Sequence, residues 1–98
     1  MTEITPTLLE EFKRRMHISH NEDDNLKQHL SFSYKAIQRK CGLFDISADE
    51  QGKELVFERA RYAYNDALEY FDDNFLSELN SFGLALAFAA EEETDETI

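Results

Sequence analysis

The feature that most constrains the fold is a run of apolar residues with helical spacing between residues 22 and 41. The apolar residues recur there at steps of three or four, which places them on one face of an α-helix. The residues of this face are Leu26, Leu30, Tyr34, Ile37 and Cys41. Asn21 is a favourable N-cap, and Gly42 is expected to end the helix in the left-handed conformation. The sequence therefore predicts an amphipathic helix over residues 22–41, whose apolar face must be covered by other parts of the chain.

A second helix is predicted at the start of the chain, over residues 6–16. Thr5 is a suitable N-cap, and Pro6 occupies the first helical position, where its missing N–H costs nothing. Thr7 and Glu10 form an alternative capping box. The chain has one Pro and three Gly among 98 residues, so few residues interrupt long helices.

The second half of the chain predicts two more helices. Gly52 weakens a helix start, so the third helix is expected to begin near residue 53 and to run to about residue 71. Asp72, Asp73 and Asn74 then break the pattern and cap a fourth helix that continues to about residue 90. Within residues 82–90 apolar residues also alternate with Ala, which leaves a strand as the alternative.

These segments predict an all-α protein, a small bundle of about four helices in a single domain. The domain is expected to cover residues 1–90, with an arm that begins near residue 84. The segment EEETDETI, residues 91–98, has too little apolar surface to fold alone and is expected to be a flexible acidic tail. An apolar connector that contains Leu43, Phe44 and Ile46 is expected to pack under the core.

Charge is distributed unevenly along the chain. The net charge is −11, all ten Lys and Arg lie at or before Arg61, and residues 62–98 carry ten acids and no base. Phosphate backbones are repelled by such a segment, which argues against broad nucleic-acid binding. A basic protein surface is a better partner for the C-terminal third.

Nothing in the sequence predicts catalysis, a cofactor or a metal site. His17 and His20 lack the further ligands that zinc requires at fixed spacing. Cys41 lies on an apolar helix face, which is typical of a small core residue, and no glycine-rich phosphate-binding motif occurs. We therefore expect a protein that is not an enzyme and that works by binding other proteins.

Targeting and membrane segments are not predicted either. The N-terminus lacks a charged region followed by an apolar stretch, and the longest apolar stretch, residues 82–90, is about half of what a membrane span needs. Cys41 is the only cysteine, so no internal disulfide can form. We expect a protein that is cytosolic or assembled in the cytosol, with no membrane partner.

Two groups of residues are candidates for protein interfaces. The aromatic residues of the third helix, among them Tyr62 and Tyr70, are spaced so that they cannot all face one core, so this helix is either central to the bundle or partly in an interface. Lys13, Arg14 and Arg15 form the only tight basic cluster. They either complement the helix dipole or pair with an acidic neighbour, such as the C-terminal third of another copy.

Two runs of sequence carry a resemblance to a known family. They are LLEEFKRRMHISHNEDDNLKQHL, a short helix followed by a polar link and an acidic helix start, and ERARYAYNDALEYFDDNFLSELNSFGLALA. With the intervening connector they resemble the small head–tail connector proteins (adaptor or head-completion proteins) of long-tailed bacteriophages. The second run is similar to the version found in phages of low-GC Gram-positive hosts, and the resemblance covers about residues 5–90.

The resemblance implies a structural protein of the virion neck, present in the host cytoplasm during assembly. Copies of such a protein form a ring that docks on the portal protein after DNA packaging. The ring extends the channel through which DNA passes and receives a stopper or tail-completion protein. By region, the resemblance makes residues 84–98 the portal-facing arm, with Leu84, Leu86 and Phe88 as its apolar contacts. A base-free acidic segment would not retain the passing DNA, although negative charge also simply favours solubility.

A second function remains open from the residues alone. A small acidic adaptor, or an inhibitor that mimics DNA, would present carboxylates to a basic protein. Such a mimic is expected to spread its acids over a folded face, whereas five of the last eight residues here are acids in one terminal segment.

Overall fold

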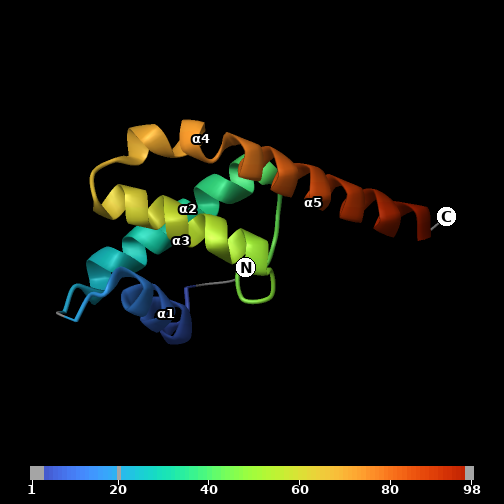
Figure 1. The fold of residues 1–98 in the computed structure, drawn as a ribbon. Coiled ribbons are helices and arrows are strands. Elements are labelled where there is room, and N and C mark those ends of the chain that lie inside the picture. Colours follow the sequence, from blue (N-terminus) through green and yellow to red (C-terminus); the bar gives the residue numbers. More distant parts are fainter. Residues whose placement is uncertain (1–3, 20, 97–98) are drawn as a thin grey trace.

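The computed structural model describes residues 4–19 and 21–96, and all regular structure in this part of the chain is helical (Figure 1). The elements are α1 (Pro6–Met16), α2 (Asp23–Cys41), α3 (Glu50–Tyr64), a short 3₁₀ helix η1 (Leu68–Tyr70), α4 (Phe71–Asn74) and α5 (Leu76–Glu96). The predicted all-α bundle is confirmed. Residues 82–90 lie within α5, so the strand alternative for this segment is wrong.

The predicted first helix agrees with α1 at both ends. The hydroxyl of Thr5 accepts a hydrogen bond of 3.2 Å from the backbone N–H of Leu8, so Thr5 is the N-cap. His17 ends the helix in the left-handed conformation, with φ 59° and ψ 38°. Local capping residues therefore set both ends of this helix.

The second helix begins one residue later than predicted and ends as predicted. Asn21 accepts a hydrogen bond from the N–H of Asp23 at 3.4 Å, while Glu22 occupies the N-cap position. Gly42 ends the helix with φ 121° and ψ 173°, which is an extended conformation rather than the expected left-handed helical one. Only glycine adopts this φ readily, and it directs the chain away from α2 into the connector.

The prediction for the third helix is wrong at both ends. The helix starts at Glu50, because the carboxylate of Asp49 caps the N–H of Gly52 at 3.0 Å. It ends at Tyr64, where Asn65 and then Asp66, with φ 58°, turn the chain. A positive φ is tolerated by Asp better than by most residues, so the turn is encoded locally.

Residues 65–75, which we call the elbow, reverse the chain between α3 and α5. Phe71 is buried and stacks on Phe75 with ring centroids 4.8 Å apart. The ring of Tyr62 packs edge-on against both, at 5.6 Å from each. This aromatic cluster holds the elbow against the end of α3.

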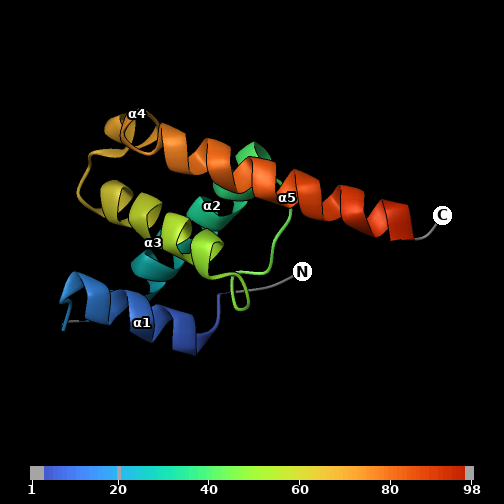
Figure 2. The ribbon, with the colours of Figure 1, turned by 45° about the vertical axis from the view of Figure 1, so that its right-hand side comes forward.

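The core lies between α2 and α3, with α1 packed on one side and the first half of α5 on the other (Figures 1 and 2). Its largest fully buried residues include Phe12, Leu26, Leu30, Ile37, Ile46, Val56, Phe57, Phe71 and Phe82. Ile46 is fully buried and Phe44 packs against the core, as predicted for the connector. The prediction is wrong for Leu43, whose side chain is 84 % exposed because it follows the turn at Gly42. No buried side-chain nitrogen or oxygen in the described residues lacks a hydrogen-bond partner.

The last helix is longer than the fourth helix predicted from the sequence. It continues from Leu76 to Glu96, so the acidic segment that was expected to be a separate tail begins as a continuation of the helix. The flexibility of that segment stays a prediction, and residues 97–98 lie outside the described part of the chain. The second half of α5 extends beyond the other helices (Figure 2), and the molecule measures 52 × 29 × 17 Å.

Candidate protein-interaction surface

The first half of α5 anchors it to the body. Leu79 and Phe82 are buried, and the ring of Phe82 packs edge-on against Phe44 at 5.0 Å. One turn further on, Leu86 is half-buried and lies over Gly42, the residue that ends α2. These three residues share one face of α5 at steps of three and four, so they hold the helix base while its end projects.

On the side of α5 away from these three residues, toward its C-terminal end, the helix is apolar and exposed to solvent. We call residues 84–90, with the sequence LALAFAA, the apolar arm. Leu84 is 59 % exposed and Phe88 is 57 % exposed, and the alanines of the arm are exposed as well. Leu84 and Phe88 are four residues apart and lie on the side of α5 away from the anchor. A contiguous exposed apolar surface of this kind is typical of a protein-interaction site.

The two tyrosines that the sequence analysis grouped together have different surroundings. Tyr70 lies on the elbow and is 60 % exposed. Tyr62 packs in the aromatic cluster, and its hydroxyl accepts a hydrogen bond of 3.0 Å from Asn74. The structure therefore places Tyr70, but not Tyr62, where a partner can reach its ring. Neither tyrosine lies on the apolar arm.

The basic cluster at the end of α1 is largely neutralised within the chain. Lys13 forms an ion pair of 2.9 Å with Asp23, and this hydrogen bond raises the pKa of the lysine. Arg15 forms hydrogen bonds of 2.7 and 2.8 Å with Glu54 of α3. Arg14 is exposed and forms no ion pair with the described residues. Of the three cations, only Arg14 is thus left for an external partner.

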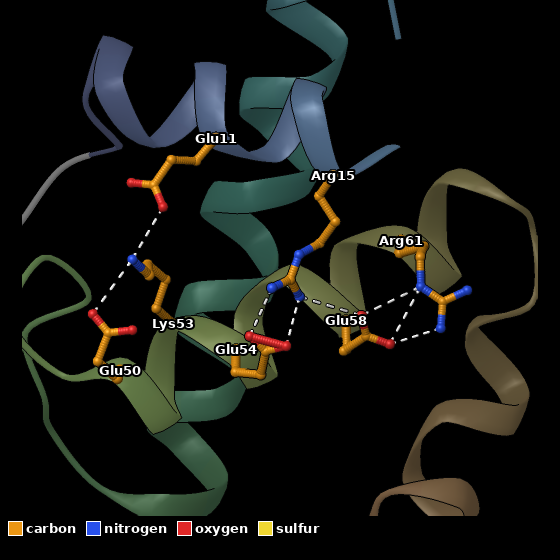
Figure 3. Close-up of polar contacts among 7 residues, drawn as sticks. All are labelled: Glu11, Arg15, Glu50, Lys53, Glu54, Glu58 and Arg61. Atoms are coloured by element: carbon orange, nitrogen blue, oxygen red, sulfur yellow. Dashed lines mark hydrogen bonds and ion pairs between the residues drawn. The ribbon is translucent and has the colours of Figure 1, made fainter. Parts of the chain in front are cut away.

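Arg15 belongs to a row of alternating charges between α1 and α3 (Figure 3). Lys53 lies between Glu11 at 3.1 Å and Glu50 at 3.7 Å. Farther along α3, Glu58 contacts both Arg15, at 3.5 Å, and Arg61, at 2.6 Å. These charges are satisfied by one another, so the row joins α1 to the body.

The same row lines a shallow groove of about 320 Å³ between α1 and α3. The hydrogen bond with Arg15 holds the pKa of Glu54 below its usual value, and the one with Glu54 raises the pKa of Arg15. Both shifts favour the charged forms, so the pairs persist at neutral pH. We therefore assign the groove to the attachment of α1 and not to a ligand.

The single cysteine and the histidines are further groups that could act as a nucleophile or as metal ligands. The thiol of Cys41 is half-buried and donates a hydrogen bond of 3.4 Å to the carbonyl of Leu79, and burial raises its pKa. Among the side chains that the structure describes, in residues 4–19 and 21–90, no group of three or more His, Cys, Asp or Glu is placed to hold a metal ion. His20, one of the two histidines in the link after α1, lies outside the described residues.

Sequence reasoning missed four further exposed apolar residues: Phe32, Leu43, Leu68 and Leu76. Phe32 lies off the apolar face of α2, and this offset is the only sequence signal of its exposure. Leu43 and Leu76 follow helix boundaries and have no comparable signal.

Within the described chain, no helix is both long enough and apolar enough to cross a membrane. No model of a protein family matches the chain, and no curated protein or solved structure matches it significantly.

Proposed function

We propose that this chain is a structural protein of a bacteriophage neck, which forms a ring on the portal and joins the head to the tail. The observation that carries the proposal is the apolar arm, an uncovered helix end that projects from a folded and anchored body. The all-α bundle agrees with what the sequence resemblance implies. In this account the arm docks on the portal and the body receives a stopper or tail-completion protein.

The energetics of the arm favour docking into a groove. Leu84 and Phe88 each leave more than half of their surface in water. Covering the rest of either side chain is worth about 1–2 kcal/mol. Two such residues at i and i+4 on one helix side are the usual anchors of helix-in-groove recognition. The expected receiving surface is therefore an apolar groove.

The charge at the end of the arm adds a second expected property of the groove that receives it. Glu91, Glu92 and Glu93 follow the arm directly in the sequence. A groove that accepts the arm would place basic side chains near its far end, where they pair with these acids. The wider segment of residues 62–98, with ten acids and no base, would not retain phosphates, so DNA would pass through the ring channel without binding to it.

The acidic-adaptor alternative makes a different prediction about the same residues. A protein that mimics DNA would bind a basic enzyme through carboxylates, without a need for Leu84 or Phe88. The exposed position of both apolar side chains favours docking of the arm over mimicry.

Co-expression with the portal protein encoded in the same genome tests the proposal. The wild-type chain is expected to co-purify with the portal, and the double variant Leu84→Ser/Phe88→Ser is expected to be lost. Deletion of residues 87–98 should have the same effect, and it spares Leu86, which packs on Gly42. Leu43→Ser is the matched control, because Leu43 is exposed but lies outside the arm. Capture of the double variant at the wild-type level would contradict the proposal, and capture of a basic DNA-binding enzyme instead would favour mimicry.

A further inference from the structure

The charged side chains fall into two sets, those that pair within the body and those that do not. Most cations of α1 and α3 form ion pairs with acids of the same chain. On α2, by contrast, Lys27, Lys35 and Arg39 are exposed and form no ion pair with any described residue, and Lys35 and Arg39 lie on the same side of the helix.

These two cations flank an exposed aromatic ring. Phe32, Lys35 and Arg39 occupy positions i, i+3 and i+7 of α2, so they share one side of the helix. Phe32 is 58 % exposed, although it lies in the middle of a helix whose opposite face forms the core. One side of α2 therefore combines an apolar contact with positive charge.

Arg59 of α3 adds a third cation next to this side of α2. Its Nη1 donates a hydrogen bond of 3.2 Å to the hydroxyl of Ser33, which uses one of five guanidinium donors. Burial lowers the pKa of Arg59, the nearby Asp72 raises it, and the like charge of Arg39 lowers it further. A half-buried arginine beside another arginine is stabilised when an anion approaches both. We call Phe32, Lys35, Arg39 and Arg59 the basic face.

The elbow is opposite in charge to the basic face and likewise carries exposed apolar residues. Asp66, Glu69 and Asp73 are exposed and form no ion pair with any residue of the described ranges. Between them, Leu68 and Tyr70 are exposed apolar residues. Asp72, which pairs with Lys40 of α2 at 2.8 Å, is already used within the chain. The elbow thus presents acids around an apolar centre.

We propose that the basic face of one copy binds the elbow of a second copy. The inference rests on the ring of the proposed function, and it names the surfaces through which neighbouring copies meet. Cations flanking Phe32 would face acids flanking Leu68 and Tyr70, so charge and apolar surface match together. The contact leaves the apolar arm uncovered and available to the portal.

Sedimentation equilibrium of the full chain tests this contact without the portal. Self-association is expected at low ionic strength and should weaken in about 0.5 M salt, where surface ion pairs are screened. Arg39→Glu and Glu69→Lys should each weaken self-association by about tenfold or more, and the double variant should recover most of the loss. Lys27→Glu is the matched control: it makes the same charge change at an exposed position on another side of α2.

Three results would contradict the proposed contact. The first is a wild-type chain that stays monomeric up to millimolar concentration at low salt. The others are an Arg39→Glu variant that self-associates no more weakly than Lys27→Glu, and a double variant that self-associates no more strongly than either single variant. Circular dichroism of each variant confirms that the fold is retained. Loss of portal capture with self-association intact would overturn the proposed function alone, because capture depends on the arm and not on the basic face.

Discussion

The hydroxyl of Tyr34 on α2 donates a hydrogen bond of 2.6 Å to the backbone carbonyl of Phe44 in the connector. The same hydroxyl accepts a hydrogen bond of 3.3 Å from the buried N–H of Ile46, so one side chain satisfies two backbone groups. The Phe44 ring then lies edge-on between Tyr34 and Phe82 of α5. The hydrogen bonds of Tyr34 therefore hold Phe44 in place, and Phe44 in turn positions the start of α5 and the arm that follows it.

The first prediction concerns that hydroxyl. Tyr34→Phe should lower the free energy of unfolding by about 1–3 kcal/mol, because the buried N–H of Ile46 loses its acceptor. Chemical denaturation measures the change. Tyr70→Phe is the control, since Tyr70 is exposed, and it should change stability by less than about 0.5 kcal/mol. Equal effects of the two substitutions would show that the hydroxyl of Tyr34 does not hold the connector.

The second prediction compares two glycines within helices. A Cβ on Gly52 would lie 2.5 Å from Cδ2 of Phe44 and 2.9 Å from Cζ of Phe82, so Gly52→Ala should destabilise the fold by about 1–3 kcal/mol. A Cβ on Gly83 would meet its nearest neighbour, Cα of Cys41, at an ordinary 3.5 Å. Gly83→Ala should therefore stabilise the protein by up to about 1 kcal/mol through helix propensity. Thermal unfolding measures the stability of both variants, which should change in opposite directions. A Gly52→Ala variant as stable as the wild type would contradict the packing of Phe44 and Phe82 on Gly52.

The third prediction is the pH dependence of the contact between Arg15 and Glu54. The pKa of Glu54 is lower in the folded chain than its usual value of 4.5, so its ionised form stabilises the fold above that pH. This contribution is lost as the pH falls below 4.5 and through the folded pKa. Because Glu54 is more than half exposed, solvent screening limits the contribution to about 0.5–1 kcal/mol.

Glu54→Gln should accordingly lower stability at pH 7 and should have little effect at the acid end of the folded range. Urea unfolding at several pH values in dilute solution measures this difference. Glu69→Gln serves as the control, because Glu69 forms no ion pair with the described residues. A destabilisation by Glu54→Gln that stays constant as the pH falls would contradict the assigned ion pair.

The fourth prediction contrasts two phenylalanines of α5. Phe82 is buried in the core, and Phe82→Ala should cost about 3–5 kcal/mol. Phe88 lies on the arm, and Phe88→Ala should change the stability of the free chain by less than about 0.5 kcal/mol. Denaturant unfolding measures both values. A large loss of stability for Phe88→Ala would mean that the arm packs on the body.

The helices that were predicted well are those with local boundary signals. Thr5 and Pro6 define the start of α1, and Gly42 defines the end of α2. The third helix was predicted wrongly because apolar residues stay in helical phase across Asn65 and Asp66, while the chain turns there. Gly52 was taken as a weak start, whereas contacts with distant rings require a residue without a side chain.

The candidate surface was only partly predictable for a similar reason. Leu84 and Phe88 were named from the sequence, but their exposure depends on where the body ends along α5. The partners of Arg15 lie about forty residues away on α3, so its neutralisation within the chain has no local signal. Tyr62 was an interface candidate from the sequence, but the chain turns after Tyr64 and brings Phe71 and Phe75 against its ring.

Hydrogen–deuterium exchange of the chain, free and bound to the portal, tests whether the portal covers the arm. Exchange in residues 84–90 is expected to be fast in the free chain and at least about tenfold slower in the complex, because the bound portal would bury these amides. This expectation would be contradicted by a stable complex in which these amides exchange as fast as before and protection appears elsewhere.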